Sequence, residues 1–286
     1  MRQDCTMPDA ANLRGAAGAT RRQLLVGGSA FALLTVARAP ALAATIDAFQ
    51  PQGTGGVDHT AFDRLLQTHV KPDGNGYNRV DYRGFAASGR AALKSYLDLL
   101  EQARPSTFAR AEAHAYWINL YNAKTLDVVL DNYPVRSIKT INLGGGGLFG
   151  RGPWSKKLIR VEGRDLSLDD VEHRIVRPIF ADPMSHYALN CASYSCPNLA
   201  TRAFTGVNLD RLMAGNAAAY VNHERGVSVA DRAITASKLY SWYASDFGGR
   251  RRLKKHWNRF ATPPLKSAIE AAPLGGFVYD WALNDV

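Results

Sequence analysis

The spacing of hydrophobic positions predicts a chain built mainly of helices with a few short strands. In four stretches, apolar residues recur every three or four positions, which is the repeat of a helix with one buried face. These stretches are residues 59–70, 89–103, 107–132 and 209–223. Strict alternation, typical of half-buried strands, is confined to short runs such as residues 227–229 and 233–235. The pattern therefore predicts a helix-rich α+β fold with a small sheet.

The longest of these helices, residues 107–132, is apolar nearly all round in its middle. A helix without a polar face is a buried one, so we expect it at the centre of the fold. Asn119 and Asn122 lie three residues apart inside this apolar surround. An unpaired buried amide costs about 1–3 kcal/mol, so each should have a specific partner. A backbone group that fixes the packing is the commoner partner, and a catalytic loop or a substrate carbonyl is the functional alternative.

The first 43 residues have the order of an export signal. Arg21 and Arg22 precede a mostly apolar run at residues 24–37, and a site of small residues ends at Ala43. The paired arginines and the glycines in the apolar run favour twin-arginine export. Fourteen residues are too few to cross a hydrocarbon core of about 30 Å. We therefore expect a periplasmic or secreted protein with no transmembrane span after cleavage of the signal.

A linker and a single globular domain are expected after the signal. Residues 44–57 are rich in glycine, proline and glutamine, as linkers are. No repeat or second boundary follows, so residues 58–286 are expected to form one domain, long enough for a substantial core. Translation could begin at Met1 or at Met7, because the basic segment before the apolar run is long.

The chain carries a net charge of +10, and its basic residues are spread out except for a cluster at residues 250–255. Such a cluster can contact an anionic surface. More often it is the solvated face of a helix. No helix-turn-helix pattern or repeat of stacking aromatic residues accompanies the cluster, so we do not expect nucleic acid as a partner.

Candidate chemistry is concentrated at residues 186–197, HYALNCASYSCP. The pattern predicts a short buried strand over residues 186–190, followed by a turn of small polar residues. Cys191 and Cys196 are the only cysteines left once Cys5 leaves with the signal. In an oxidising compartment they could form a structural disulfide. A thiol on such a loop could equally act as a nucleophile.

A nucleophilic Cys191 would need a base within hydrogen-bond reach. An extended strand would place His186 about 16 Å away, so His173 is the preferred base. Asn119 or Asn122 could orient the imidazole, as in Cys-His-Asn hydrolases. The resulting hypothesis is a papain- or transglutaminase-like site for acyl transfer, with the activity of an amidase or peptidase.

The helix that would carry His173 is expected at residues 168–177, because Ser167 and Asp170 form a capping box. Glu172 is the neighbour of His173 on that helix. Consecutive side chains on a helix point about 100° apart. Glu172 would therefore contribute charge or orient a different group.

Other side chains and backbone groups near Cys191 could support the reaction. The N–H groups of Ala192 and Ser193 are candidate donors to an oxyanion. His186, Asn190 and Ser193 are the candidates for supporting roles.

Three other functions remain open. Cys191 and Cys196 could cycle between dithiol and disulfide in a periplasmic thiol oxidoreductase, although the Cys-x-x-Cys motif is absent. Zinc could be held by Cys191 with three more ligands, which are Glu172, His173 and His186. No His-x-x-x-His pair supports that site, and we expect neither a metal nor another cofactor. Finally, the protein could be a non-catalytic envelope scaffold with a structural disulfide, binding an unknown peptide, glycan or envelope component.

Four blocks of the sequence together resemble the family catalogued as domain of unknown function 547, which occurs in bacteria and plants. The blocks are YWINLYNA at 116–123, LSLDDVEH at 166–173, HYALNCASYSCP at 186–197 and SKLYSWYASDFG at 237–248. The likeness extends over about residues 60–250. The family has no agreed activity, so the resemblance implies the extent of the fold more than a chemistry.

Overall fold

The computed structural model describes residues 47–144 and 152–286. The predicted export signal at residues 1–43 lies outside the described residues, as does the start of the predicted linker. Within the described part, no helix has both the length and the apolar character needed to cross a bilayer.

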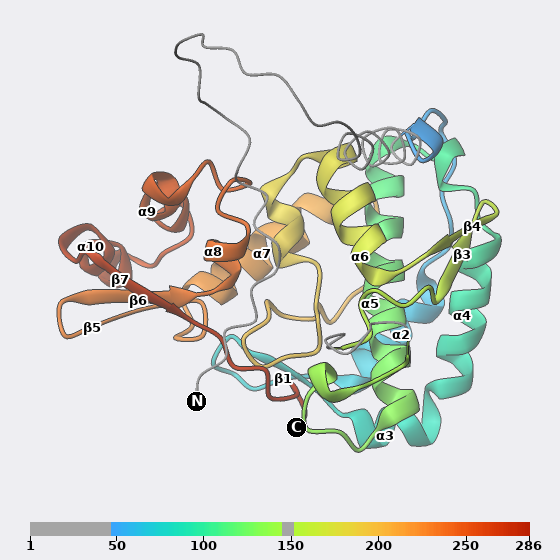
Figure 1. Cartoon of the computed structure of the whole chain (residues 1–286), viewed down its shortest axis with the longest axis horizontal. Helices are drawn as coiled ribbons and strands as arrows, with labels where there is room; N and C mark the ends of the chain where they lie inside the picture. Colours follow the sequence, from blue (N-terminus) through green and yellow to red (C-terminus); the bar gives the residue numbers. More distant parts are fainter. Residues whose placement is uncertain (1–46, 145–151) are drawn as a thin grey trace, which may run out of the picture.

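One part of the molecule, the α5 core, is a set of helices packed around α5 (Figure 1). Every residue of α5 from 113 to 123 is buried, so the predicted central helix is confirmed. An apolar surface on all sides requires neighbours on all sides. The elements of this core are α2 (Thr60–His69), α3 (Tyr82–Ser88), α4 (Arg90–Gln102), α5 (Arg110–Asn132), α6 (Leu168–Asp170) and the π-helix η3 (Val171–Phe180).

The second part, the β6 core, has its own buried apolar cluster beside the first. Its sheet has the order β5-β6-β7, with β5 and β6 antiparallel and β6 and β7 parallel. The strands predicted at residues 227–229 and 233–235 are confirmed, and they pair as an antiparallel hairpin. The elements are α7 (Leu209–Val221), β5 (Val227–Ala230), β6 (Ala233–Ser237), α8 (Leu239–Trp242), α9 (Leu253–Trp257), α10 (Pro263–Ala271) and β7 (Leu274–Val278).

The remaining elements are short. Two antiparallel pairs are β1 (Val70–Pro72) with β2 (Asn78–Val80), and β3 (Ile159–Val161) with β4 (Arg164–Leu166). The 3-10 turns are η1 (Pro105–Thr107), η2 (Ile138–Thr140), η4 (Pro183–Tyr187) and η5 (Arg250–Arg252). The expected helix-rich α+β class is confirmed. The finer likeness to papain or transglutaminase stays a prediction.

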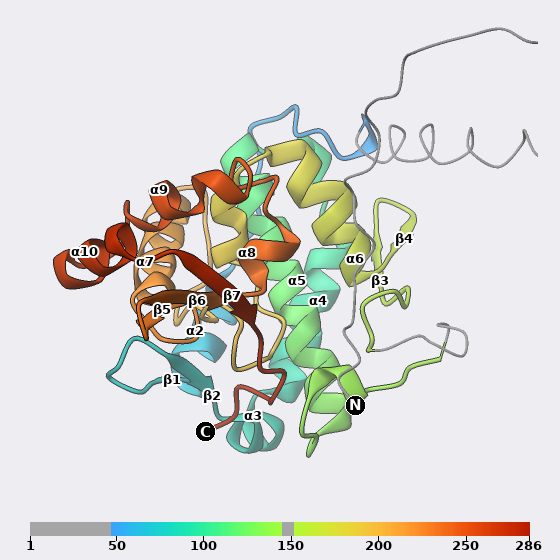
Figure 2. The same ribbon diagram turned by 60° about the vertical axis from the view of Figure 1, so that its left-hand side comes forward.

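The chain crosses between the two cores at its C-terminus. In the turned view of Figure 2, the segment after β7 leaves the sheet and ends near β2 and α3. Val80 donates its N–H to the carbonyl of Asn284 at 2.8 Å, and Val286 donates to the carbonyl of Val80 at 3.2 Å. This C-terminal segment therefore ties the β6 core to the α5 core.

The predicted strand over residues 186–190 is wrong. The Asp182 carboxylate accepts the N–H of Met184 at 2.8 Å, and Pro183 occupies the first helical position, so the chain forms the 3-10 turn η4. Ala188 and Leu189 then donate to the carbonyl of Ser185. These local hydrogen bonds replace the ladder that a strand would need, and an irregular loop follows.

The capping box predicted at Ser167 and Asp170 is confirmed. Ser167 Oγ accepts the N–H of Asp170 at 3.2 Å, and Asp170 Oδ2 accepts the N–H of Ser167 at 2.8 Å. The helix continues beyond its predicted end as the wider π-helix η3, to Phe180. This helix carries Glu172 and His173.

Candidate functional site

A cavity of about 50 Å³ lies where the two cores meet. Its walls come from α5, α6, η3, η4, α8, the segment before β3, the loop after η4 and the C-terminal segment. Two cysteines, two carboxylates and one histidine line it together with six aromatic rings. Those rings belong to Tyr121, Trp154, Trp242, Tyr243, Tyr279 and Trp281. We call it the cysteine cavity.

The Cys191 thiol is surrounded by hydrogen-bonding groups. Its Sγ atom lies 3.1 Å from Cys196 Sγ, 3.2 Å from Ser193 Oγ and 3.3 Å from Tyr279 Oη. Ser193 Oγ and Tyr279 Oη are themselves 2.8 Å apart. Cys191 is half-buried, whereas Cys196 is only 4% exposed, and both are free thiols. Cys196 and one of the two hydroxyls can therefore donate to a thiolate at Cys191, since the other hydroxyl uses its single proton in the contact between Ser193 and Tyr279.

The two thiols differ in acidity. The hydrogen bond from Cys196 lowers the pKa of Cys191 to about 7, with help from Ser193 and Tyr279 and against the effect of burial. Burial, followed by the contact with Cys191, raises the pKa of Cys196 well above its usual value. At neutral pH, Cys191 is the nucleophilic member of the pair and Cys196 is the protonated one.

The alkylation rate of Cys191 is expected to rise with pH through a midpoint near pH 7, the pKa of its thiol, and to level off about two pH units higher, where the thiolate is almost fully formed. An ordinary thiol, with a pKa near 8.5, is only roughly 3% thiolate at pH 7. Iodoacetamide labelling followed by intact mass measures the midpoint. In the Cys196→Ala variant, which lacks the main donor, the midpoint should move upward. A wild-type midpoint near 8.5 would contradict this description of the site.

Asn122 fixes the loop that carries Cys191. Its Nδ2 donates to the carbonyl of Ala188 at 2.8 Å, and its Oδ1 accepts the N–H of Asn190 at 2.8 Å. Asn190 in turn accepts the N–H of Ala192 at 2.9 Å. Ala192 has a φ of 60°, in the left-handed region, which is costly for a non-glycine residue. The two asparagines thus hold a strained backbone directly after the cysteine.

Asn119 lies away from this loop. Its Nδ2 donates to the carbonyl of Phe204 at 2.7 Å, and its Oδ1 accepts the N–H of the same residue at 3.0 Å. These contacts match the packing interpretation of a buried amide. Among the described residues, Asn119 makes no hydrogen bond to a histidine.

The structure places His186 and not His173 at the cysteine cavity. His173 Nδ1 lies 3.2 Å from Arg177 Nη1. His186 reaches the cavity because η4 turns the chain, which removes the separation that an extended strand would impose. Its Nε2 lies 2.8 Å from Asp246 Oδ2, and its ring stacks on Tyr243 at 4.1 Å.

Asp246 completes a charged network that sequence reasoning missed. Arg177 donates to it from Nε at 2.7 Å and from Nη2 at 3.0 Å. Burial opposes ionisation, but the hydrogen bonds from His186 and Arg177 hold the pKa of Asp246 well below its ordinary value. Its position in the block at 237–248 was the one available signal.

The Asp246→Asn variant is expected to lose about 1–3 kcal/mol of stability at pH 7, because hydrogen bonds to a charged group are lost. The depressed pKa means that the contribution of Asp246 is complete above about pH 4. It disappears as the pH falls through the lower folded-state value, so the variant and the wild type should converge in acid. Denaturation at a series of pH values from 7 down to about 2 measures this, and the difference should narrow progressively below about pH 4. The exposed Asp98→Asn serves as control, and an equal loss there would contradict the assignment.

Glu172 brings a buried negative charge to the cysteine cavity. Burial would raise its pKa, but His173, His186 and a hydrogen bond from Tyr243 outweigh burial, so the pKa of Glu172 is lowered. Its charge opposes ionisation of Cys191. Glu172 therefore places a negative charge beside the Cys191 thiol.

Of the two expected oxyanion donors, the N–H of Ala192 is engaged, whereas the N–H of Ser193 donates to no other described residue. The N–H of Ala192 donates to Asn190 Oδ1, and the N–H of Cys191 donates to Cys196 Sγ at 3.0 Å. The proposed zinc ligands also do not converge, because no three His, Cys, Asp or Glu side chains in the described ranges lie close enough together to hold a metal ion.

Residues 105–221 match the family model described as protein of unknown function, DUF547. Searches among curated proteins and among solved structures each found no match. The matched region includes α5, η3, η4, both cysteines and α7, whereas Asp246 and Tyr279 lie beyond it. The resemblance to the DUF547 family expected from the sequence blocks is therefore confirmed over residues 105–221.

Proposed function

We propose that the protein is a thiol–disulfide oxidoreductase of the cell envelope, with Cys191 as the attacking thiol and Cys196 as the resolving thiol. The observation that supports it best is the 3.1 Å separation of the two Sγ atoms, one half-buried at a cavity wall and the other fully buried. The signal-like sequence at residues 1–43 supports an oxidising location, periplasmic or secreted.

The reaction follows from the difference between the two thiols. The Cys191 thiolate attacks one sulfur of a substrate disulfide, and the other sulfur leaves as a thiolate. Cys196 then gives up its proton and attacks Cys191 Sγ, which releases the second substrate thiolate. Two electrons pass to the substrate, and a Cys191–Cys196 disulfide remains. The reverse sequence oxidises a dithiol substrate.

Equilibration with mixtures of reduced and oxidised glutathione tests this proposal. We expect one disulfide per chain that forms and breaks reversibly as the ratio changes, measured by alkylation and intact mass. A disulfide that resists the reductant would instead favour the envelope scaffold with a structural cross-link. Two thiols that stay unpaired at every ratio would exclude the redox cycle.

A second candidate is cysteine-dependent acyl transfer, which His186 favours because it lines the same cavity as Cys191 and is paired with Asp246. We propose His186 as the base in this alternative, in place of His173. Acyl transfer needs open oxyanion donors. The N–H groups of Cys191 and Ala192 are engaged, which weighs against this candidate and leaves the N–H of Ser193 as the one expected donor that is open among the described residues.

p-Nitrophenyl acetate distinguishes the two candidates. Attack by the Cys191 thiolate on the ester carbonyl releases p-nitrophenolate and leaves an acetyl thioester, which water must hydrolyse for turnover. A hydrolase should release many equivalents of nitrophenolate per chain, whereas an oxidoreductase should stop after about one.

A further inference from the structure

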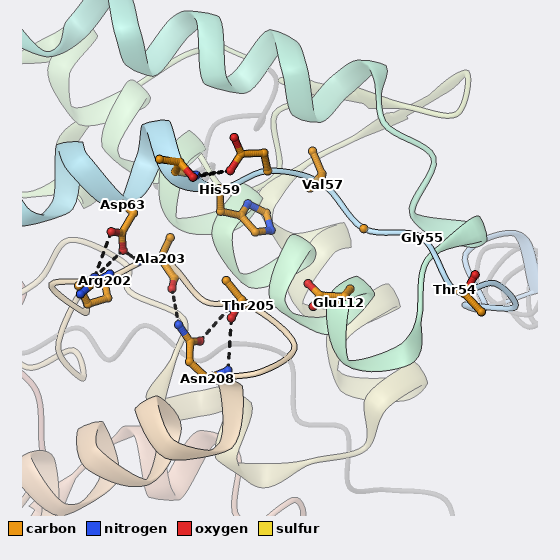
Figure 3. Close-up of a pocket in the computed structure, with 13 residues that line it drawn as sticks. Thr54, Gly55, Val57, His59, Asp63, Glu112, Arg202, Ala203, Thr205 and Asn208 are labelled. Carbon is orange, nitrogen blue, oxygen red and sulfur yellow. Dashed lines mark hydrogen bonds and ion pairs between the residues drawn. The ribbon is translucent and has the colours of Figure 1, made fainter.

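A second and larger cavity, of about 550 Å³, lies on the α5 core, away from the cysteines. It is lined by residues 54–60 before and at the start of α2, by Glu112 on the first turn of α5, and by the segment before α7. Figure 3 shows the side chains of His59, Glu112 and Thr205 around one end of it. We call it the Glu112 cavity.

The Glu112 carboxylate is unpaired among the residues that the structure describes. No hydrogen bond or ion pair links it to another described residue. A glutamate at the third position of a helix usually accepts the N–H of the residue before the helix. Here that N–H belongs to Ala109, and it donates instead to the carbonyl of Gly55 at 2.9 Å. The capping function of Glu112 is therefore already fulfilled by the backbone.

Two glycines make room for the Glu112 side chain. A Cβ atom at Gly206 would lie 2.5 Å from Glu112 Oε1, and a Cβ atom at Gly56 would lie 3.4 Å from Glu112 Cγ. The first distance is impossible without movement. The carboxylate thus sits in a space that exists because residue 206 has no side chain.

His59 provides an independent indication of a ligand. It is only 4% exposed, it lines the Glu112 cavity, and its Nε2 has no hydrogen-bond partner. Its other ring nitrogen, Nδ1, lies 2.6 Å from Tyr96 Oη. In Figure 3 the ring projects toward the side of the cavity where Glu112 lies. An unpaired buried polar atom costs stability unless something meets it.

The charges of the lining favour a cation. Asp63 and Arg202 pair at 2.8 Å and offset each other, which leaves the carboxylates of Asp58 and Glu112. Burial lowers the pKa of His59 to about 4, so its ring is neutral at pH 7 and does not oppose a positive ligand. Asp58 uses one oxygen to hold Thr60, and the carboxylate of Glu112 is uncommitted.

The shape and chemistry of the lining narrow the class of cation. The acidic and histidine side chains of the described residues do not converge on a point that would suit a metal ion. Apart from His59, no aromatic ring of the described residues lines this cavity, and quaternary ammonium groups are usually bound by aromatic rings. We propose that the Glu112 cavity binds a small organic primary amine, whose ammonium group pairs with the Glu112 carboxylate.

Titration with n-butylammonium at low ionic strength tests the proposal, with binding followed by NMR or calorimetry on the purified protein. n-Butanol has the same carbon chain without the charge, and tetramethylammonium has the charge without N–H donors. We expect n-butylammonium to bind at least about tenfold more tightly than either, as a charged hydrogen bond provides. Equal affinity for n-butylammonium and n-butanol would overturn the proposal, as would no binding of n-butylammonium.

Substitutions in the Glu112 cavity test whether n-butylammonium binds there. Glu112→Gln should weaken n-butylammonium binding at least about tenfold, whereas Glu224→Gln, the same change at an exposed site, should leave it unchanged. Gly206→Ala retains the charge but displaces the carboxylate, and it should also weaken binding. If Glu112→Gln does not melt cooperatively and is therefore not folded, the affinity of Gly206→Ala for n-butylammonium tests the proposal instead. Wild-type affinity in a folded Glu112→Gln or Gly206→Ala variant would overturn the assignment.

Discussion

The Cys191→Ser variant is expected to lose thiol–disulfide exchange by at least about a thousandfold. A hydroxyl is almost never ionised near neutral pH, whereas Cys191 is held near its ionisation point by Cys196, Ser193 and Tyr279. The assay is reduction of a small aromatic disulfide, followed by absorbance of the released thiolate. Cys196 alone cannot replace the lost nucleophile, because burial keeps it protonated.

The matched control is Cys196→Ala. This variant retains the attacking thiol but has no resolving thiol, so it should accumulate a mixed disulfide with the substrate that intact mass detects. Two results would contradict the proposed roles. One is exchange that persists in Cys191→Ser. The other is a large loss of stability in Cys191→Ser under oxidising conditions only, which would identify the cysteine pair as a structural cross-link.

Replacing Asn122 with alanine is expected to cost about 2–5 kcal/mol of unfolding free energy. The substitution leaves the carbonyl of Ala188 and the N–H of Asn190 buried without their partner. It also releases the loop that holds Ala192 in its left-handed conformation, so the donors around Cys191 should lose their fixed positions. Urea denaturation measures the stability, and iodoacetamide labelling at pH 7 should be slower than in the wild type.

Asn119→Ala provides the comparison for this experiment. Asn119 makes the same number of backbone hydrogen bonds, both to Phe204, from the same buried helix. Its loss should therefore cost a similar free energy but leave the alkylation rate of the folded protein unchanged. If both variants slow alkylation equally, Asn122 has no special part in positioning Cys191.

The repeat of apolar positions determined the main elements of this protein. The all-round apolar middle of α5 predicted a central buried helix, because such a surface is stable only among neighbours. Ser167 and Asp170 predicted their capping box, since both partners lie within one helical turn. Because an unpaired buried amide is costly, the sequence also predicted a specific polar partner for each of Asn119 and Asn122.

Local patterns failed where a short apolar run had two possible conformations. The segment at residues 186–190 reads as a strand by its composition, but the Asp182 side chain and Pro183 start a 3-10 turn instead. This one difference decides which histidine reaches the cysteine cavity. A strand would separate His186 from Cys191, whereas the turn lets both line the same walls.

The residues that line the two cavities come together only in the tertiary structure. Tyr279 reaches Cys191 across 88 positions, and Asp246 reaches His186 across 60. The Glu112 cavity likewise joins the segment before α2 to the segment before α7. Periodicity reports that a face is buried but not what it is buried against, because that depends on how separate elements pack. The sequence thus determined the helices and the presence of two thiols, and packing determined the groups that set their chemistry.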